Sequence, residues 1–419
     1  MYQKIILSSS DASYQLDPIL TWLVKKCGDT VTPIIAKIIN FSSDSSCIPN
    51  SWKIALVIPL IKNLDIDPVL ENFRPVSNLS FASKIAEKAV ISQLLNHCNE
   101  HAPLPTNQSL YRQFHSTETA LIKVETDILS SMDRQEVTLL VLLDLSAAFD
   151  TVDDETTVAL LESYFGVANE ALLWIKSFLS GRKQRVVVEQ KQSRDFDVVT
   201  GIPQGSFLGP ILFIMYASRL FHVVKKHLPN IQCYADDSQL YLSFRPDSIK
   251  SQDEAVSSME RCISDIRAWM TNNYRKLNDT KTESLVIGSR QQLTKIKIEC
   301  IRVGSTEIQK VSSVRNLGAW FDTSMTMTTH IGKACSKGFF GLYKIKQIRK
   351  FLSEKATATL IHAFVTSHLD YCNSLFYGVL KDVRAKLFLR IPTAHKIHSA
   401  ISGYVMHRAC ALRKLSKHT

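Results

Sequence analysis

The hydrophobic pattern of the chain switches repeatedly between short strand-like runs and longer stretches with apolar residues at helical spacing. The strand-like runs fall at residues 52–61, 137–144, 184–190, 195–200, 281–288, 296–303 and 314–321. Helical spacing is clearest at residues 83–97, 117–131, 154–165, 171–179, 211–224 and 251–273. Because helices alternate with antiparallel hairpins, the pattern predicts an α+β fold.

Three consecutive parts are expected along the chain. Residues 1–42 form an amphipathic helical extension, residues 43–320 hold the strand-rich body, and residues 321–419 are mainly helical. From Ile331 onward there are 16 Lys and Arg but 3 Asp and Glu, whereas the preceding residues carry 34 and 36. A basic C-terminal part beside a nearly neutral body suits a partner rich in phosphates. Solvated Lys and Arg on ordinary helices would give the same counts.

Cysteine spacing and hydropathy exclude several classes of protein. The nine cysteines are scattered and none forms a Cys-x₂-Cys pair, so neither a zinc knuckle nor a disulfide framework is expected. No run of 18 apolar residues occurs, and residues 1–10 lack the layout of a signal peptide. We therefore expect a soluble intracellular protein without a membrane partner, acting in the nucleus, the cytoplasm or both.

Three acidic residues on two apolar runs are the chief candidates for chemistry. Asp144 ends the run that begins at Val137, and Asp236 and Asp237 lie in the hairpin-like segment 231–242. Adjacent carboxylates repel each other unless a cation neutralises them. Two Mg²⁺ ions, with Mn²⁺ as a substitute, are the simplest explanation, because polymerases use such a pair. An ordinary surface turn is the alternative for Asp236 and Asp237 taken alone.

An ordered set of motifs between Leu16 and about Leu380 resembles the reverse transcriptases of non-LTR (LINE-type, jockey-like) retrotransposons. The matching segments are Asn72–Leu79 (fingers motif), His115–Leu121 (the helix after it), Leu143–Val152 (motif A), Gly201–Pro210 (motif B), Tyr234–Asp237 (motif C), Leu277–Glu283 (motif D) and Asn316–Gly318 (primer grip). A Tyr-x-Asp-Asp alone would be weak evidence, but the ordered set is specific.

The resemblance implies a right-hand polymerase fold. Fingers and an antiparallel-sheet palm would occupy residues 43–320, and a helical thumb with a truncated tail would follow. The implied activity is RNA-directed DNA polymerisation, in which dNTPs are added to a DNA primer on an RNA template. Asp144 and Asp236 would bind both metal ions, Asp237 would contribute more weakly, and the Leu145 carbonyl would add an oxygen ligand.

The resemblance also assigns nucleotide contacts. Phe149 would be the aromatic floor under the incoming sugar, and Arg74 would grip the triphosphate. Gln204 and Gly205 would contact the nascent pair, and Lys281 would protonate the leaving pyrophosphate. The alternatives are a core role for Phe149, an ordinary turn for the glycine loop, and solvated charge for Arg74 and Lys281.

Further residues are assigned to the template and primer. They are Lys62, Arg112, Gly201, Pro203, Leu317 and Gly318. One departure from the family lies nearby, since Leu110 stands where relatives have glycine. A positive φ there would strain leucine by roughly 1–2 kcal/mol.

Complete elements of this kind carry an N-terminal endonuclease, and the residues before Leu16 are too few for one. An endonuclease could therefore act in trans. Two hypotheses follow: an active polymerase, favoured by the three carboxylates, or a catalytically inactive relic that only binds nucleic acid, favoured by Leu110 and the divergent tail. A Mg²⁺-dependent phosphodiesterase is disfavoured by motif B and Phe149, which would serve nucleotide selection.

Overall fold

The computed structural model describes residues 1–11, 16–17, 19–62, 66–101, 104–144, 152–189, 191–272 and 277–377. Helices and sheets are mixed throughout these ranges, which confirms the α+β class. The chain forms two compact units: unit 1 comprises residues 1–106, 145–222 and 267–276, and unit 2 the segments 107–144, 223–266 and 277 onward. Because the units interleave along the chain, the three consecutive parts expected from sequence remain a prediction.

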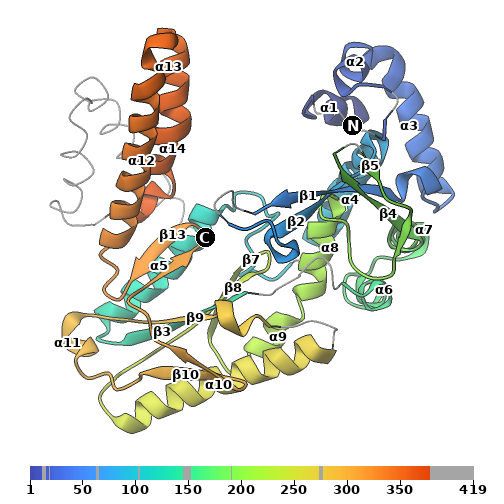
Figure 1. Cartoon of the computed structure of the whole chain (residues 1–419). Helices are drawn as coiled ribbons and strands as arrows, with labels where there is room; N and C mark the ends of the chain where they lie inside the picture. Colours follow the sequence, from blue (N-terminus) through green and yellow to red (C-terminus); the bar gives the residue numbers. More distant parts are fainter. Residues whose placement is uncertain are drawn as a thin grey trace. The chain divides into compact units, whose positions relative to one another are not determined.

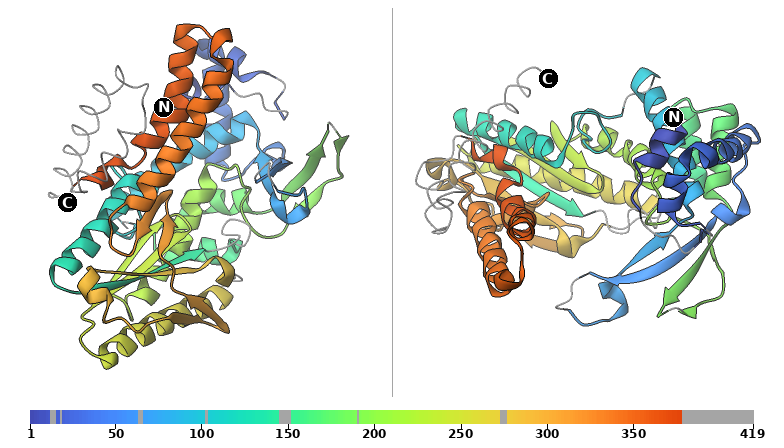
Figure 2. Two further views of the ribbon diagram at one scale, coloured as in Figure 1. Left: turned by 60° about the vertical axis from the view of Figure 1, so that its left-hand side comes forward. Right: turned by 90° about the horizontal axis from the view of Figure 1, so that it is seen from above.

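Unit 1 contains a five-stranded sheet in the order β2-β1-β4-β5, with β6 also paired to β4. Its strands are β1 (Ile54–Ile61), β2 (Phe73–Asn78), β4 (Arg182–Val188), β5 (Lys191–Gln192) and β6 (Phe196–Val198). Strand β1 runs antiparallel to β2 and parallel to β4. Both views of Figure 2 show the blue β1–β2 hairpin beside the green strands that follow α7. The predicted hairpin of residues 184–200 is confirmed in the β4–β6 pair.

Helices complete unit 1. They are α1 (Tyr2–Leu7), α2 (Thr21–Lys26), α3 (Gly28–Asp44), α4 (Phe81–His101), α6 (Asp154–Ser163), α7 (Asn169–Leu179) and α8 (Leu208–Ala217). The single helix predicted for residues 211–224 is wrong, because α8 ends at Ala217 and a short α9 (Leu220–Val224) follows. Both the backbone N–H (3.2 Å) and the hydroxyl (2.6 Å) of Ser218 donate to the Met215 carbonyl, which diverts that carbonyl from the helical ladder.

Unit 2 is built on an antiparallel sheet in the order β7-β8-β3-β9. Its strands are β3 (Val137–Asp144), β7 (Asn230–Tyr234), β8 (Asp237–Phe244) and β9 (Glu283–Ile287). Helix α5 (Thr117–Asp133) packs on this sheet through Leu121, Val124 and Ile128, all fully buried. The N-cap of α5 is Ser116, whose side chain accepts from the Thr119 N–H.

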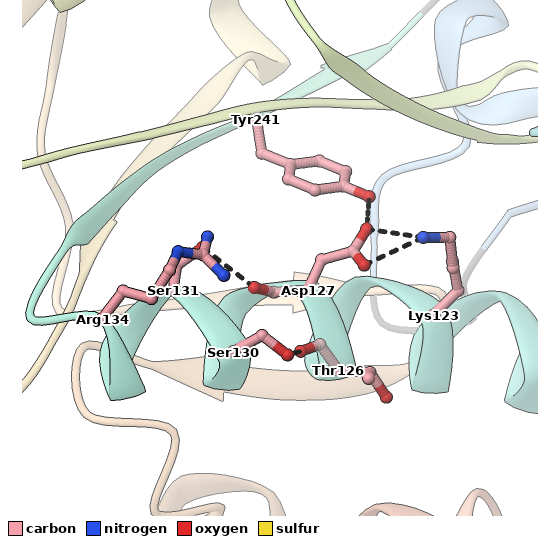
Figure 3. Close-up of polar contacts among 7 residues, drawn as sticks. All are labelled: Lys123, Thr126, Asp127, Ser130, Ser131, Arg134 and Tyr241. Atoms are coloured by element: carbon pink, nitrogen blue, oxygen red, sulfur yellow. Dashed lines mark hydrogen bonds and ion pairs between the residues drawn. The ribbon is translucent and has the colours of Figure 1, made fainter. Parts of the chain in front are cut away.

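A polar contact also joins α5 to the sheet. The buried Tyr241 of β8 donates its hydroxyl to Asp127 Oδ2 at 2.7 Å, and Lys123 pairs with the same carboxylate at 2.9 Å (Figure 3). Burial and the nearby Asp127 charge raise the pKa of Tyr241, so the phenol stays a hydrogen-bond donor. The contact fixes the helix against the strand that begins at Asp237.

Further helices and strands complete unit 2. They are α10 (Ile249–Asn272, which continues into unit 1), α11 (Arg290–Leu293), β10 (Cys300–Val303), β11 (Thr306–Gln309), β12 (Ser313–Asn316), β13 (Ala319–Asp322), α12 (Thr328–Ile348), α13 (Glu354–Ile361), a π-helical turn (His362–Thr366) and α14 (Ser367–Asp370). Figure 1 shows α12 and α13 side by side beyond β13. No helix in the described ranges is long and apolar enough to cross a membrane.

The single strand predicted at residues 314–321 is wrong, because this segment forms the β12–β13 hairpin. Its two central residues have positive φ, 43° at Leu317 and 88° at Gly318. Such a pair makes a tight two-residue turn whose twist matches the flanking strands. Because Leu317 is apolar, the hydrophobic pattern of this segment does not indicate the turn.

Candidate active site

Two of the three acidic residues lie directly opposite each other. Asp144, the last residue of β3, pairs in register with Asp237, the first residue of β8. Asp237 also pairs with Tyr234, so Ala235 and Asp236 form the two-residue turn between β7 and β8. The predicted hairpin with acids at its turn is therefore present, and the strands gather the acids at one end of the sheet.

An open pocket of about 530 Å³ lies at this end of the sheet. Its walls include Asp144, Asp237, Lys281 and Leu317, which come from four separate segments of unit 2. The structure thus brings together predicted residues of motifs A, C and D and of the primer-grip segment. Asp236, on the turn, is half-buried.

Opposite charges meet in the pocket. Lys281 lies in the 3₁₀ turn Asp279–Lys281, and its Nζ is 2.9 Å from Asp144 Oδ2. The Asn278 N–H donates to the Asp144 carbonyl at 3.3 Å, which fixes the turn beside the strand end. Lys281 therefore stands where it can act on a group bound at Asp144.

Negative charge accumulates at the neighbouring carboxylate. Although Asp237 reaches the surface, desolvation of its carboxyl group and the charges of Asp236 and Asp144 raise its pKa to about 6. A divalent cation would relieve this repulsion, so these donors fit the expected ions. Within the part of the chain that the structure describes, no three His, Cys, Asp or Glu side chains are gathered as a metal-binding group. The expected ligand Leu145 lies outside the described residues, so the ligand set stays a prediction.

A tyrosine that sequence reasoning missed supports the turn of the β12–β13 hairpin. The Tyr371 hydroxyl donates to the Leu317 carbonyl at 2.5 Å. A Cβ atom at Gly318 would lie 2.9 Å from the Tyr371 ring, and the backbone φ there is 88°. Space and conformation thus both require glycine. Tyr371 is 54 residues away in sequence, and no local pattern links the two.

The glycine loop of motif B lies in unit 1 and is held against β2. The Ser77 N–H donates to the Gln204 carbonyl at 2.8 Å. Gly205 has a φ of 147°, and a Cβ atom there would lie 2.1 Å from the Ser77 carbonyl oxygen. The family resemblance implied that Gly205 lets a nucleotide approach the backbone closely. The structure adds a different reason, which is contact with the chain's own backbone.

A buried carboxylate that was also missed anchors the end of this loop. Glu87 of α4 is fully buried and accepts hydrogen bonds from the Ser206 hydroxyl at 2.6 Å, the Phe207 N–H at 2.7 Å and the Leu208 N–H at 3.1 Å. It thereby satisfies N–H groups at the start of α8, where a negative charge is favoured. In the sequence Glu87 lies between Ala86 and Lys88 in a segment predicted to be helical, where a charged residue would be expected to face solvent.

The other predicted contacts are dispersed. Arg74 is exposed on β2, and Lys62 follows β1, where its N–H donates to the Asn72 carbonyl at 2.8 Å. Gly201, with a φ of 87°, and Pro203 lie in the glycine loop of unit 1. Arg112 is half-buried in unit 2. Phe149, like Leu145, lies outside the described residues.

The expected strain at Leu110 is not found. Positive φ occurs at its neighbour Tyr111 (58°) and at Phe114 (64°), but not at Leu110 itself. The leucine at this position is therefore accommodated without the expected backbone strain.

Comparisons with known proteins agree with the geometry. Residues 61–321, more than half of the chain, match the family model "Reverse transcriptase (RNA-dependent DNA polymerase)". The chain is 27% identical over 317 residues to "Probable RNA-directed DNA polymerase from transposon BS" of Drosophila melanogaster, which covers 74% of this chain and 34% of that protein. It is 26% identical over 308 residues to "RNA-directed DNA polymerase from mobile element jockey" of the same organism, with 72% and 32% covered.

A third relative comes from another organism, and one solved structure can be compared. The "Retrovirus-related Pol polyprotein from type-1 retrotransposable element R1" of Bradysia coprophila is 25% identical over 350 residues, with 82% of this chain and 33% of the relative covered. Apo telomerase from Candida tropicalis, truncated from its C-terminal domain, has a TM-score of 0.42 and 11% identity, with 64% of this chain and 57% of that chain covered. The chain spans about a third of the length of these curated relatives. On the match of the family model, the chain belongs to the reverse transcriptase (RNA-dependent DNA polymerase) family.

Proposed function

We propose that this chain is an RNA-directed DNA polymerase of retrotransposon origin, which adds dNTPs to the 3′-hydroxyl of a DNA primer on an RNA template. Reverse transcriptases generally use divalent metal ions and work on an RNA template with a primer. The observation that carries the proposal is the opposition of Asp144 and Asp237 in one pocket with Lys281 and Leu317, in a chain of this family.

The acidic residues would hold two Mg²⁺ ions, and Mn²⁺ would substitute for them. Asp144 and Asp236 would be the direct ligands, with Asp237 and the Leu145 carbonyl as further oxygen donors. When bound, the ions supply polarisation of the primer hydroxyl and stabilise charge on the phosphates. The raised pKa of Asp237 supports this assignment, because a carboxylate that is desolvated and also repelled by Asp236 and Asp144 gains from a shared cation.

The remaining residues would position the substrates. In polymerisation the primer 3′-hydroxyl gives up its proton to water, its oxygen bonds to the α-phosphorus of the dNTP, and the bond from that phosphorus to pyrophosphate breaks. Lys281 would leave Asp144 and donate a proton to the pyrophosphate. The turn at Leu317 and Gly318 would support the primer end, and its link to Tyr371 would keep it in place.

Contacts to the triphosphate, base and template are proposed for residues of unit 1 and for Arg112 of unit 2. Arg74 would bind the triphosphate and Phe149 would select against a 2′-hydroxyl, while Gln204 and Gly205 would lie beside the nascent pair. Lys62, Gly201 and Pro203 in unit 1, together with Arg112, would contact the template or primer. Each assignment follows the motif match, and among these residues Lys62, Arg74 and Gly205 are exposed.

The duplex would lie against the basic C-terminal helices. Helix α12 carries four exposed lysines, Lys333, Lys337, Lys344 and Lys346. Contacts to phosphates tolerate any sequence, as template copying requires. Residues 43–320 would thus act as fingers and palm and residues from 321 as the thumb. An endonuclease in trans, and action in the nucleus or cytoplasm where RNA and dNTPs occur, complete the proposal.

Primer extension tests the proposal. Purified protein, an RNA template, a DNA primer, dNTPs and Mg²⁺ should give extension that Asp236→Asn abolishes. Asp253→Asn, at an exposed position on α10, is the matched control and should extend normally. Absence of extension with either Mg²⁺ or Mn²⁺, with duplex binding retained, would refute the proposal and leave a relic that binds nucleic acid.

A further inference from the structure

We infer that Gln108 is a positioning residue, whose side-chain amide holds the turn between β7 and β8 and so sets where Asp236 and Asp237 point. The inference rests on the proposed function, because it concerns the same acidic residues.

The segment before α5 lies along the edge of β7 that faces away from β8. The Ser109 N–H donates to the Cys233 carbonyl at 3.0 Å, and the Cys233 N–H donates to the Asn107 carbonyl at 2.8 Å. Gln232 Nε2 donates to Ser109 Oγ at 2.8 Å and adds a side-chain contact. Gln108 pairs in parallel with Cys233 and is 1% exposed. Its side chain is therefore fixed beside Cys233, which lies two residues before Ala235 at the start of the turn.

The Gln108 amide binds both polar backbone groups of one residue. Its Oε1 accepts from the Ala235 N–H at 3.1 Å, and its Nε2 donates to the Ala235 carbonyl at 3.4 Å. The same Oε1 accepts from the Leu110 N–H at 3.1 Å, which holds the amide in place. The peptide groups on both sides of Ala235 are thus held from one side chain, immediately before Asp236.

The turn needs this support because of its own residue. Ala235 has a φ of 57°, whereas Asp236 does not have a positive φ. Positive φ at only the first central position of a two-residue hairpin turn is the pattern that prefers glycine. Alanine is disfavoured there by its Cβ atom. The unfavourable backbone conformation of the turn is therefore stabilised by hydrogen bonds from outside the hairpin, and Gln108 makes two of them.

Only an amide of this length meets the geometry. A methionine of similar shape offers no donor and only a weak sulfur acceptor, and asparagine is one methylene too short. Partners that orient metal ligands typically change metal affinity or activity by about 10- to 100-fold when removed. Gln108→Met should accordingly weaken Mn²⁺ binding by about 10- to 100-fold and lower kcat, with little change in KM for the template–primer.

The test compares wild type, Gln108→Met, Ala235→Gly and the double variant. Mn²⁺ binding is measured by calorimetry, the protection of the Ala235 amide by hydrogen exchange, and kcat and KM by primer extension. Gln113→Met, at an exposed glutamine of the same segment, is the control. Ala235→Gly removes the conformational penalty, so Gln108→Met should cost less in that background. If Gln108→Met does not fold, Gln108→Asn gives the same comparison.

The possible outcomes distinguish failure of the role inferred for Gln108 from failure of the proposed function. Weaker Mn²⁺ binding with faster exchange at Ala235, reduced by Ala235→Gly, supports the inference. Unchanged Mn²⁺ binding in Gln108→Met, or an equal penalty in both backgrounds, overturns it and leaves the proposed function standing. Wild-type protein that neither binds Mn²⁺ nor extends a primer overturns both.

Discussion

Replacing Glu87 with alanine should release the glycine loop from α4. The Glu87 carboxylate is fully buried and accepts from the Ser206 hydroxyl and from the Phe207 and Leu208 N–H groups, which belong to the loop and the start of α8. Its other oxygen accepts from the Ser83 hydroxyl at 3.2 Å. Without the carboxylate these donors lose their acceptor.

The structure gives the expected size of the effect. Each buried donor left without an acceptor costs about 1–3 kcal/mol, and loss of a buried charged partner costs about 3–5 kcal/mol overall. We therefore expect Glu87→Ala to destabilise unit 1 by about 3–5 kcal/mol. A loss of about 3 kcal/mol corresponds to roughly 100-fold faster exchange of the amides it protects. Glu87→Gln, which keeps the shape but turns one acceptor into a donor, should lie in between.

Hydrogen exchange at Phe207 and Leu208, together with urea unfolding, measures the effect. Glu100→Ala on the same helix is the control, because its side chain is 71% exposed and should change stability by less than about 0.5 kcal/mol. Equal exchange at Phe207 and Leu208 in Glu87→Ala and Glu100→Ala would refute the reasoning, since the four hydrogen bonds would then not hold the loop.

Three further predictions concern pH, charge and space. Burial lowers the pKa of His330 to about 4, so the unfolded chain takes up a proton between pH 6.5 and 4 that the folded chain does not. Stability should therefore fall by roughly 3 kcal/mol as the pH drops through that window, and urea titrations of His330→Gln should not show this fall. Lys281→Ala should change stability by less than about 1 kcal/mol, because its ion pair with Asp144 is exposed. The same change should slow primer extension about 100-fold, and normal extension would exclude the proposed role of Lys281 as a proton donor. Gly205→Ala should lower stability by more than about 2 kcal/mol, whereas Gly332→Ala, in open space on α12, should raise it by about 0.5–1 kcal/mol; similar melting curves would contradict the steric argument.

Local signals predicted most of the elements that carry the site. The run ending at Asp144 is strand β3, the acids at 236 and 237 lie at a hairpin turn, and the helix predicted at residues 117–131 is α5. These features depend on residues close together in the chain, where periodicity and capping act directly. The errors were local as well: the break at Ser218 and the turn after Asn316 depend on backbone contacts that apolar pattern does not register.

The order of the acidic and glycine-rich motifs, and the family to which they point, were determined by the amino-acid sequence alone. Only the tertiary structure decided what supports them. Glu87 meets Phe207 across 120 residues, Gln108 meets Ala235 across 127, and Tyr371 meets Leu317 across 54. Such contacts join segments that no helical or strand period connects, and they form only when packing brings a buried polar group to the one backbone group that can satisfy it.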